Sequence, residues 1–121
     1  IIGILAAVAI PQYQNYIART QVSRVVGEIS ALRTAAEEMT MRGALSNGTD
    51  ITLLGFTGSN LASVADVAVS SAGVTTIVAT MNGDSASVIK AASTTVTLTR
   101  SAVGAWSCAV SPTTYAPSGC P

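Results

Sequence analysis

The sequence predicts an α+β fold in which one long N-terminal helix packs on a four-stranded antiparallel β-sheet. Apolar residues recur at helical spacing through the first third of the chain, and runs rich in Val, Thr and Ile follow in the second half. Two cysteines close the C-terminal end. The length of 121 residues suits one domain. Only 10% of residues are charged and 49% are hydrophobic, so we expect surfaces that pack closely on other molecules.

The helix is predicted over residues 1–42. Pro11 lacks a backbone N–H and is expected to kink the helix there. Beyond it, apolar residues recur alternately four and three positions apart, which predicts one buried helix face. The stop signal is Gly43, directly after the last of them. The stripe comprises Ala18, Val22, Val25, Ile29, Leu32, Ala36 and Met39.

A helix of this length would reach about 60 Å, roughly twice the diameter of a small domain. The uniformly apolar half, residues 1–16, is therefore expected to project from a globular head formed by residues 17–121. The opposite face of the helix carries three pairs of opposite charge spaced by four, each worth ~0.3–0.5 kcal/mol when exposed. These pairs are Arg24 with Glu28, Arg33 with Glu37, and Glu38 with Arg42.

The strands are predicted at 67–70, 74–81, 94–100 and 105–110. Within TTVTLTR, residues 94–100, Val96 and Leu98 alternate with threonines, as in a strand with one buried face. Residues 43–65 are rich in turn signals and predict a long loop with one short element at 61–64. Trp106 is expected to be the largest core side chain.

The cysteines, Cys108 and Cys120, flank a turn-rich segment and predict a disulfide loop. Such a bond indicates an oxidising compartment and stabilises the fold by about 3 kcal/mol. The chain contains no histidine, and its aspartates are isolated. We therefore expect no catalytic residues, no metal site and no cofactor. Six basic and six acidic residues cancel, so no nucleic-acid site is indicated.

Both ends of the chain resemble a known family. The segment IIGILAAVAIPQYQNYIAR closely resembles the N-terminal helix of type IVa major pilins, such as those of pseudomonads. TLTRSAVGAWSCAV looks like the last two strands of that family, and PSGCP like its closing end. Residues 43–93 match only in outline. The resemblance implies that a further stretch precedes Ile1, with a leader cleavage site, a methylated first residue and a single glutamate.

The resemblance implies the major structural subunit of a retractile type IV pilus. Its partners would be other copies of itself in a helical homopolymer and the assembly machinery of the inner membrane. The apolar run would lie in that membrane before assembly and pack in the filament core afterwards, where small residues let helices approach closely. The expected core-packing residues are Ile1, Ile2, Gly3, Ile4, Leu5, Ala6, Ala7, Val8, Ala9, Ile10 and Pro11.

The filament would serve twitching motility, adhesion, and phage and DNA uptake at the cell surface. The disulfide loop is a candidate for binding a host-cell glycan, an abiotic surface, a phage or DNA, through Ser111, Pro112, Thr113, Thr114, Tyr115 and Pro117. A loop that simply fixes the C-terminus is the alternative. Alternative functions are a minor pilin, a type II secretion pseudopilin, or a membrane-tethered receptor-binding module. The last would need a basic or aromatic patch, which the sequence does not show.

Overall fold

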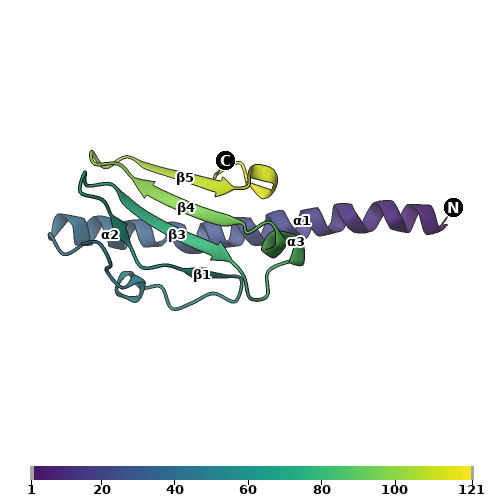
Figure 1. The fold of residues 1–121 in the computed structure, drawn as a ribbon, viewed down its shortest axis with the longest axis horizontal. Helices are drawn as coiled ribbons and strands as arrows, with labels where there is room; N and C mark the ends of the chain where they lie inside the picture. The colour runs from purple at the N-terminus through teal and green to yellow at the C-terminus, as the bar shows by residue number, and fades with distance from the viewer. Residues whose placement is uncertain (1, 121) are drawn as a thin grey trace.

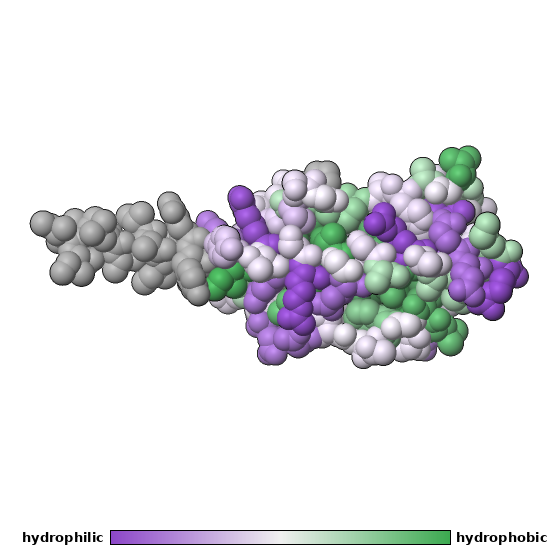
Figure 2. Space-filling view, turned by 180° about the vertical axis from the view of Figure 1, so that it is seen from behind, coloured by the Kyte–Doolittle hydropathy of each residue, from purple (hydrophilic) through white to green (hydrophobic). Residues whose placement is uncertain are grey.

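The computed structural model describes the backbone of residues 2–120 and the side chains of residues 15–120. One long helical rod runs the length of the molecule, and an antiparallel sheet covers only its C-terminal part (Figure 1). The N-terminal half of the rod extends beyond the sheet, and the C-terminus lies near the middle of the molecule. Sheet and helix form two layers with the core between them. On the face that Figure 2 shows, hydrophilic and hydrophobic residues of the head are interspersed.

The rod consists of α1 (Ile2–Ser30) and α2 (Leu32–Met41). Only Ala31 separates them, and its φ of −63° and ψ of −23° remain helical, so the single helix predicted over 1–42 is two segments in line. The assigned helix continues through Pro11. All seven residues of the predicted stripe are buried, each with no more than 8% of its surface exposed. The helical spacing therefore identified the face that packs on the sheet.

The sheet contains β1 (Ala62–Val64), β2 (Ala68–Val69), β3 (Thr75–Met81), β4 (Thr95–Arg100) and β5 (Trp106–Ser111). The strand order is β1-β3-β4-β5, and β2 also pairs with β3. Since β1 pairs with the last residues of β3 and β2 with its first, the two short strands share one edge. The predicted antiparallel sheet is confirmed, and it has a fifth strand because the short element predicted at 61–64 forms β1.

The inner face of the sheet is built by alternation along its strands. Ile77 lies opposite Leu98, and Ala79 lies opposite Val96; all four side chains are fully buried. The threonines of β4 between them are half-buried on the other face. This confirms the pattern predicted from TTVTLTR.

The connections also contribute to the core. The turn η1 (Ile51–Leu54) and the short helix α3 (Ser87–Ala91) were not predicted. They bury Ile51, Leu54 and Ile89, which extends the core beyond the helix and sheet. The turn η1 ends at Gly55, whose φ of +95° favours glycine. Among the described residues, no helix combines the length and apolarity that a membrane crossing requires.

Candidate functional site

The boundary between projecting helix and head lies near Ala18. This residue is fully buried, whereas Asn15 and Tyr16 are exposed, Tyr16 with 71% of its surface. The predicted core-packing side chains from Ile1 to Pro11 lie outside the side chains that the structure describes, although the backbone of residues 2–11 is helical. Their packing in a filament therefore remains a prediction.

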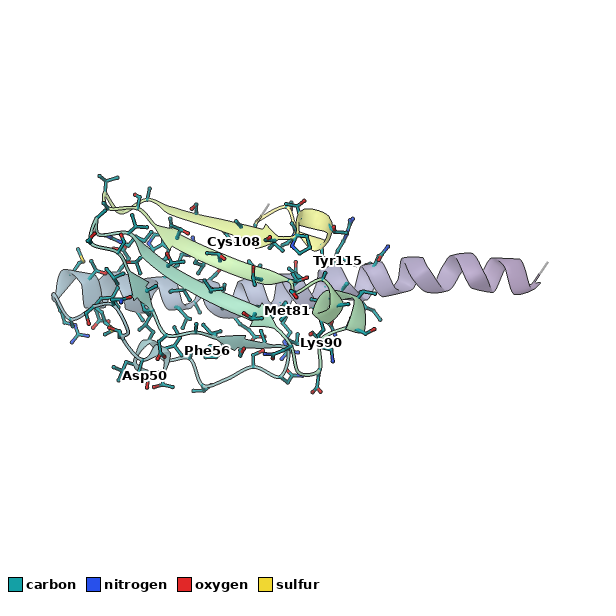
Figure 3. The ribbon with its side chains drawn as sticks, in the orientation of Figure 1. Asp50, Phe56, Met81, Lys90, Cys108 and Tyr115 are labelled. Atoms are coloured by element: carbon teal, nitrogen blue, oxygen red, sulfur yellow. A yellow bond between two sulfur atoms is a disulfide. The ribbon has the colours of Figure 1, made fainter. Side chains whose placement is uncertain are left out.

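The disulfide joins Cys108 on β5 to Cys120, with the two Cα atoms 4.9 Å apart. This confirms the predicted pairing. Cys120 is fully buried and belongs to the hydrophobic core, and Cys108 is half-buried against it. The bond therefore anchors the end of the chain to the sheet, as Figure 3 shows near the labelled Cys108.

The segment between the two cysteines is only partly exposed. Ser111, Thr113 and Thr114 are exposed, whereas the two prolines of the predicted binding loop, Pro112 and Pro117, are half-buried. Tyr115, the aromatic residue of this loop, is half-buried and packs against the core. The turn η2 (Thr113–Tyr115) contacts α1, which explains why the tyrosine turns inward. The loop thus presents hydroxyl groups rather than an aromatic ring.

A half-buried polar cluster centres on Glu37 of α2. Its Oε1 accepts hydrogen bonds from Arg100 Nε at 2.6 Å and from Trp106 Nε1 at 2.7 Å. The bond from Arg100, followed by that from Trp106, lowers the pKa of Glu37 below its ordinary value. The predicted pair of Arg33 with Glu37 was wrong. Glu37 lies against the sheet, where Arg100 is only 15% exposed and better placed to pair.

Trp106 is therefore not simply a core filler. Its ring is half-buried against the core, and its indole N–H satisfies the Glu37 carboxylate. Since Glu37 comes from α2, Arg100 from β4 and Trp106 from β5, the cluster ties the helix to two strands. Nothing in local spacing indicated this role.

The other two predicted pairs are present. Arg24 Nε lies 3.1 Å from Glu28 Oε1, and Arg42 Nε lies 3.6 Å from Glu38 Oε1. Glu28 Oε1 is buried, and Arg24 is its ionic partner. Arg24 also donates to Asn60 Oδ1 at 2.6 Å. This bond links α1 to the loop that follows η1.

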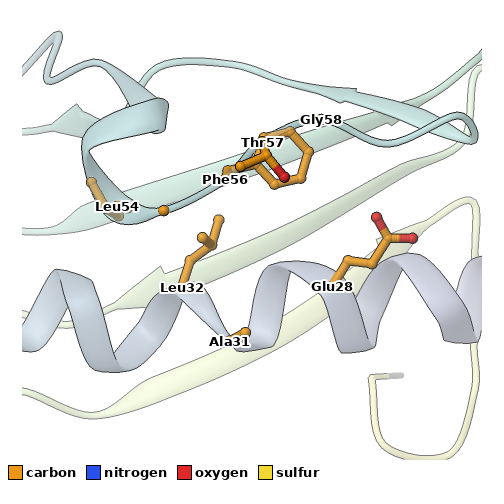
Figure 4. A pocket seen from close by; sticks show the side chains of 8 residues that line it. Glu28, Ala31, Leu32, Leu54, Phe56, Thr57 and Gly58 are labelled. Atoms are coloured by element: carbon orange, nitrogen blue, oxygen red, sulfur yellow. The ribbon is translucent and has the colours of Figure 1, made fainter.

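Two grooves flank the helix. The first, of about 390 Å³, lies between the junction of α1 and α2 and the loop after η1, with Leu32, Leu54 and Phe56 on its walls and Glu28 at one end (Figure 4). The second, of about 510 Å³, lies between α1 and the disulfide loop. Among the described residues, no group of three His, Cys, Asp or Glu side chains could hold a metal ion.

Comparisons with known proteins agree with this architecture. The family model described as Pilin (bacterial filament) matches residues 18–121. The chain is 43% identical to a fimbrial protein of Pseudomonas aeruginosa, over 100% of this chain and 88% of that protein. It is 41% identical to the type IV major fimbrial protein FimA of Dichelobacter nodosus, over 99% and 86% of the two chains.

A third relative, the type IV major alpha-pilin of Moraxella bovis, is 34% identical over 91% of this chain and 77% of its own. The family consists of structural filament subunits, which agrees with the expectation that the chain is not an enzyme. The family match begins at the first buried residue of the stripe and includes the whole sheet and the disulfide. The chain therefore belongs to the pilin family of bacterial filaments, as a major pilin of the type IV class.

Proposed function

We propose that the chain polymerises through the N-terminal half of its helix into a retractile filament on the cell surface. Residues 1–16 would form the filament core, and residues 17–121 would form the outer head. One observation carries this division: the helix extends beyond the sheet (Figure 1), and the extending part has the apolar sequence IIGILAAVAI. Apolar surface of this kind needs a partner outside its own domain.

Residues 1–16 would have two successive environments. Before assembly, lipid of the inner membrane would surround it, with the pilus assembly machinery as the partner that extracts it. In the filament, identical helices would replace lipid. Gly3 and the alanines after it would let those helices approach closely, as small residues do between membrane helices.

The outer surface would provide the uses of the filament, namely twitching motility, adhesion, and phage and DNA uptake. The exposed hydroxyl groups of Ser111, Thr113 and Thr114 support the disulfide loop as a surface for a host-cell glycan or an abiotic surface. Because the disulfide fixes both ends of this loop, binding would order few further residues.

The test places one charge in the proposed core. In the bacterium that carries the gene, Ala9→Asp should abolish sheared surface filaments and twitching, because a charge at the centre of an apolar segment costs about 3 kcal/mol in a membrane. Thr113→Asp is the matched control, since it adds the same charge at an exposed head position, and it should still assemble.

The readout must separate assembly from folding. Alkylation of thiols before and after reduction would report the disulfide, and thus the folded head, in every variant. Wild-type filament yield from Ala9→Asp, with the protein present at normal level, would refute a packed core in residues 1–16.

A further inference from the structure

Half of the charged side chains have no ion pair within the subunit. The six basic and six acidic residues all lie among the described side chains, and they form three ion pairs, through Glu28, Glu37 and Glu38. Three cations and three anions are left, all exposed: Arg19, Arg33 and Lys90, and Asp50, Asp66 and Asp84. A neutral chain with equal numbers of unpaired charges can pair them between copies.

One unpaired cation lines a groove. The second groove, here called the α1–loop groove, is formed by Tyr16, Arg19, Thr20 and Ser23 of α1 and by residues 116–118 of the disulfide loop. Tyr16 and Arg19 are exposed, and the Thr20 hydroxyl already donates to the Tyr16 carbonyl oxygen. Tyr and Arg side chains in a concave site are typical of interface hot spots. The lining residues 116–118 directly follow Tyr115, which Figure 3 labels at the end of the head from which α1 projects.

Carboxylates that could pair with Arg19 lie at the turn η1. Asp50 Oδ1 accepts from Thr52 N at 2.9 Å, and Asp66 Oδ1 accepts from Ile51 N at 3.2 Å, so the same turn orients both carboxylates. The hydrogen bonds from Thr52 lower the pKa of Asp50 below its ordinary value. Leu53, on the same turn, exposes 68% of its surface. The turn, with its N-cap Asp50 and the Asp66 side chain hydrogen-bonded to it, thus presents two anions and one exposed apolar side chain.

The two surfaces lie toward opposite ends of the head. In Figure 3, Asp50 is far from Tyr115 along the long axis. An open filament is built by contacts between two different surfaces of the subunit, and the groove and the turn are two such surfaces. Asp84 is less suitable, since it lies in the connection between β3 and α3, and α3 lies at the end of the head from which α1 projects (Figure 1).

We infer that the α1–loop groove of one subunit receives the η1 turn of a neighbouring copy. In this contact, Arg19 pairs with Asp50 and Asp66, and Leu53 covers the ring of Tyr16. The contact rests on the proposed filament function and specifies which surfaces of the heads meet in it.

Charge reversal tests the contact in the full chain. In the bacterium that carries the gene, Arg19→Glu should lower the yield of sheared filaments about tenfold, the effect of losing a hot-spot arginine. Arg33→Glu is the matched control because Arg33 is also an exposed, unpaired helix cation, and it should assemble as the wild type does. The double variant Asp50→Asn and Asp66→Asn keeps the side-chain oxygens as acceptors and should reproduce the loss.

Cross-linking gives a second readout. Filaments of the double variant Thr20→Cys and Leu53→Cys, which keeps Arg19 and places one cysteine in the groove, should form disulfide-linked ladders on a non-reducing gel. The control, Thr20→Cys with Val103→Cys, pairs the groove with another exposed apolar residue, 92% exposed, and should form none. Each single-cysteine variant checks that the Cys108–Cys120 bond does not exchange.

The outcomes separate this contact from filament formation itself. Normal filaments from Arg19→Glu, or filaments of the cysteine pair without ladders, would overturn the contact and leave the proposed function intact. If the cysteine pair forms no filaments, the filament yield of Arg19→Glu compared with that of Arg33→Glu decides whether the contact exists. Normal filaments from Ala9→Asp would instead contradict the proposed function.

Discussion

Two alanine substitutions on one turn of α1 should change stability in opposite directions. Ile29 is fully buried against the sheet, and Gly27 is exposed on the other face. A Cβ atom added at Gly27 would meet nothing within 4 Å. Because both variants place alanine in the same helix two positions apart, comparing them tests which face of the helix is buried.

The magnitudes follow from these environments. Truncating a buried Ile to Ala costs about 2–5 kcal/mol, and the better helix propensity of Ala offsets roughly 0.5 kcal/mol. We expect Ile29→Ala to lower the free energy of unfolding by about 3 kcal/mol. Replacing an exposed helical Gly by Ala should raise it by about 0.5–1 kcal/mol. For a chain of this length, 1 kcal/mol shifts the Tm by about 4 °C.

The assay is thermal unfolding of the full chain in mild detergent, with the disulfide intact, followed by circular dichroism. Ile29→Ala should melt about 12 °C below the wild type, and Gly27→Ala about 3 °C above it. A loss below about 1 kcal/mol for Ile29→Ala would mean that the α1–sheet layer is not the core. A loss of stability for Gly27→Ala would mean that the face at Gly27 is covered in the subunit.

Other changes test the disulfide and the Glu37 cluster. Replacing Cys108 and Cys120 together by serine should cost about 3 kcal/mol, by the loop-closure estimate for a separation of 12 residues, as measured by urea unfolding; an unchanged midpoint would contradict this. For Glu37, the lowered pKa in the folded state means that its contribution is complete above the ordinary carboxyl value of about 4.3. That contribution is lost as the pH falls through the lower folded-state pKa. Glu37→Gln should therefore make the acid decline of stability shallower, and an acid limb as steep as that of the wild type would exclude Glu37 as a source of it. Trp106→Phe removes one of the two hydrogen bonds to Glu37 and should raise its pKa, which NMR titration of the carboxyl would detect.

Features with a strong local period could be predicted from the sequence. The stripe from Ala18 to Met39 and the alternation in β4 were both found buried as expected, since helices and strands place every side chain at a fixed angle to its neighbours. The two cysteines could be paired because no others compete. The apolar half of the helix could also be predicted, because an unbroken run of apolar residues is visible in the sequence without knowledge of the rest of the chain.

Features that depend on distant pairing could not be predicted. Glu37 finds its partner Arg100 across 63 positions rather than its neighbour Arg33, and η1 and α3 exist because their apolar side chains reach a core formed elsewhere. An exposed charge pair on a helix is worth only ~0.3–0.5 kcal/mol, so a better-placed partner on a strand outweighs it.

The sequence by itself determined that this chain has an apolar helical half, an amphipathic helical half, and a sheet closed by a disulfide. Only the tertiary structure decided which charges stay unpaired and where they lie. It placed Arg19 beside the disulfide loop and Asp50 toward the far end of the head. Which side chains of a helix or strand are buried follows from the spacing of apolar residues over a few positions. The position of one exposed side chain relative to another depends instead on how the whole chain packs.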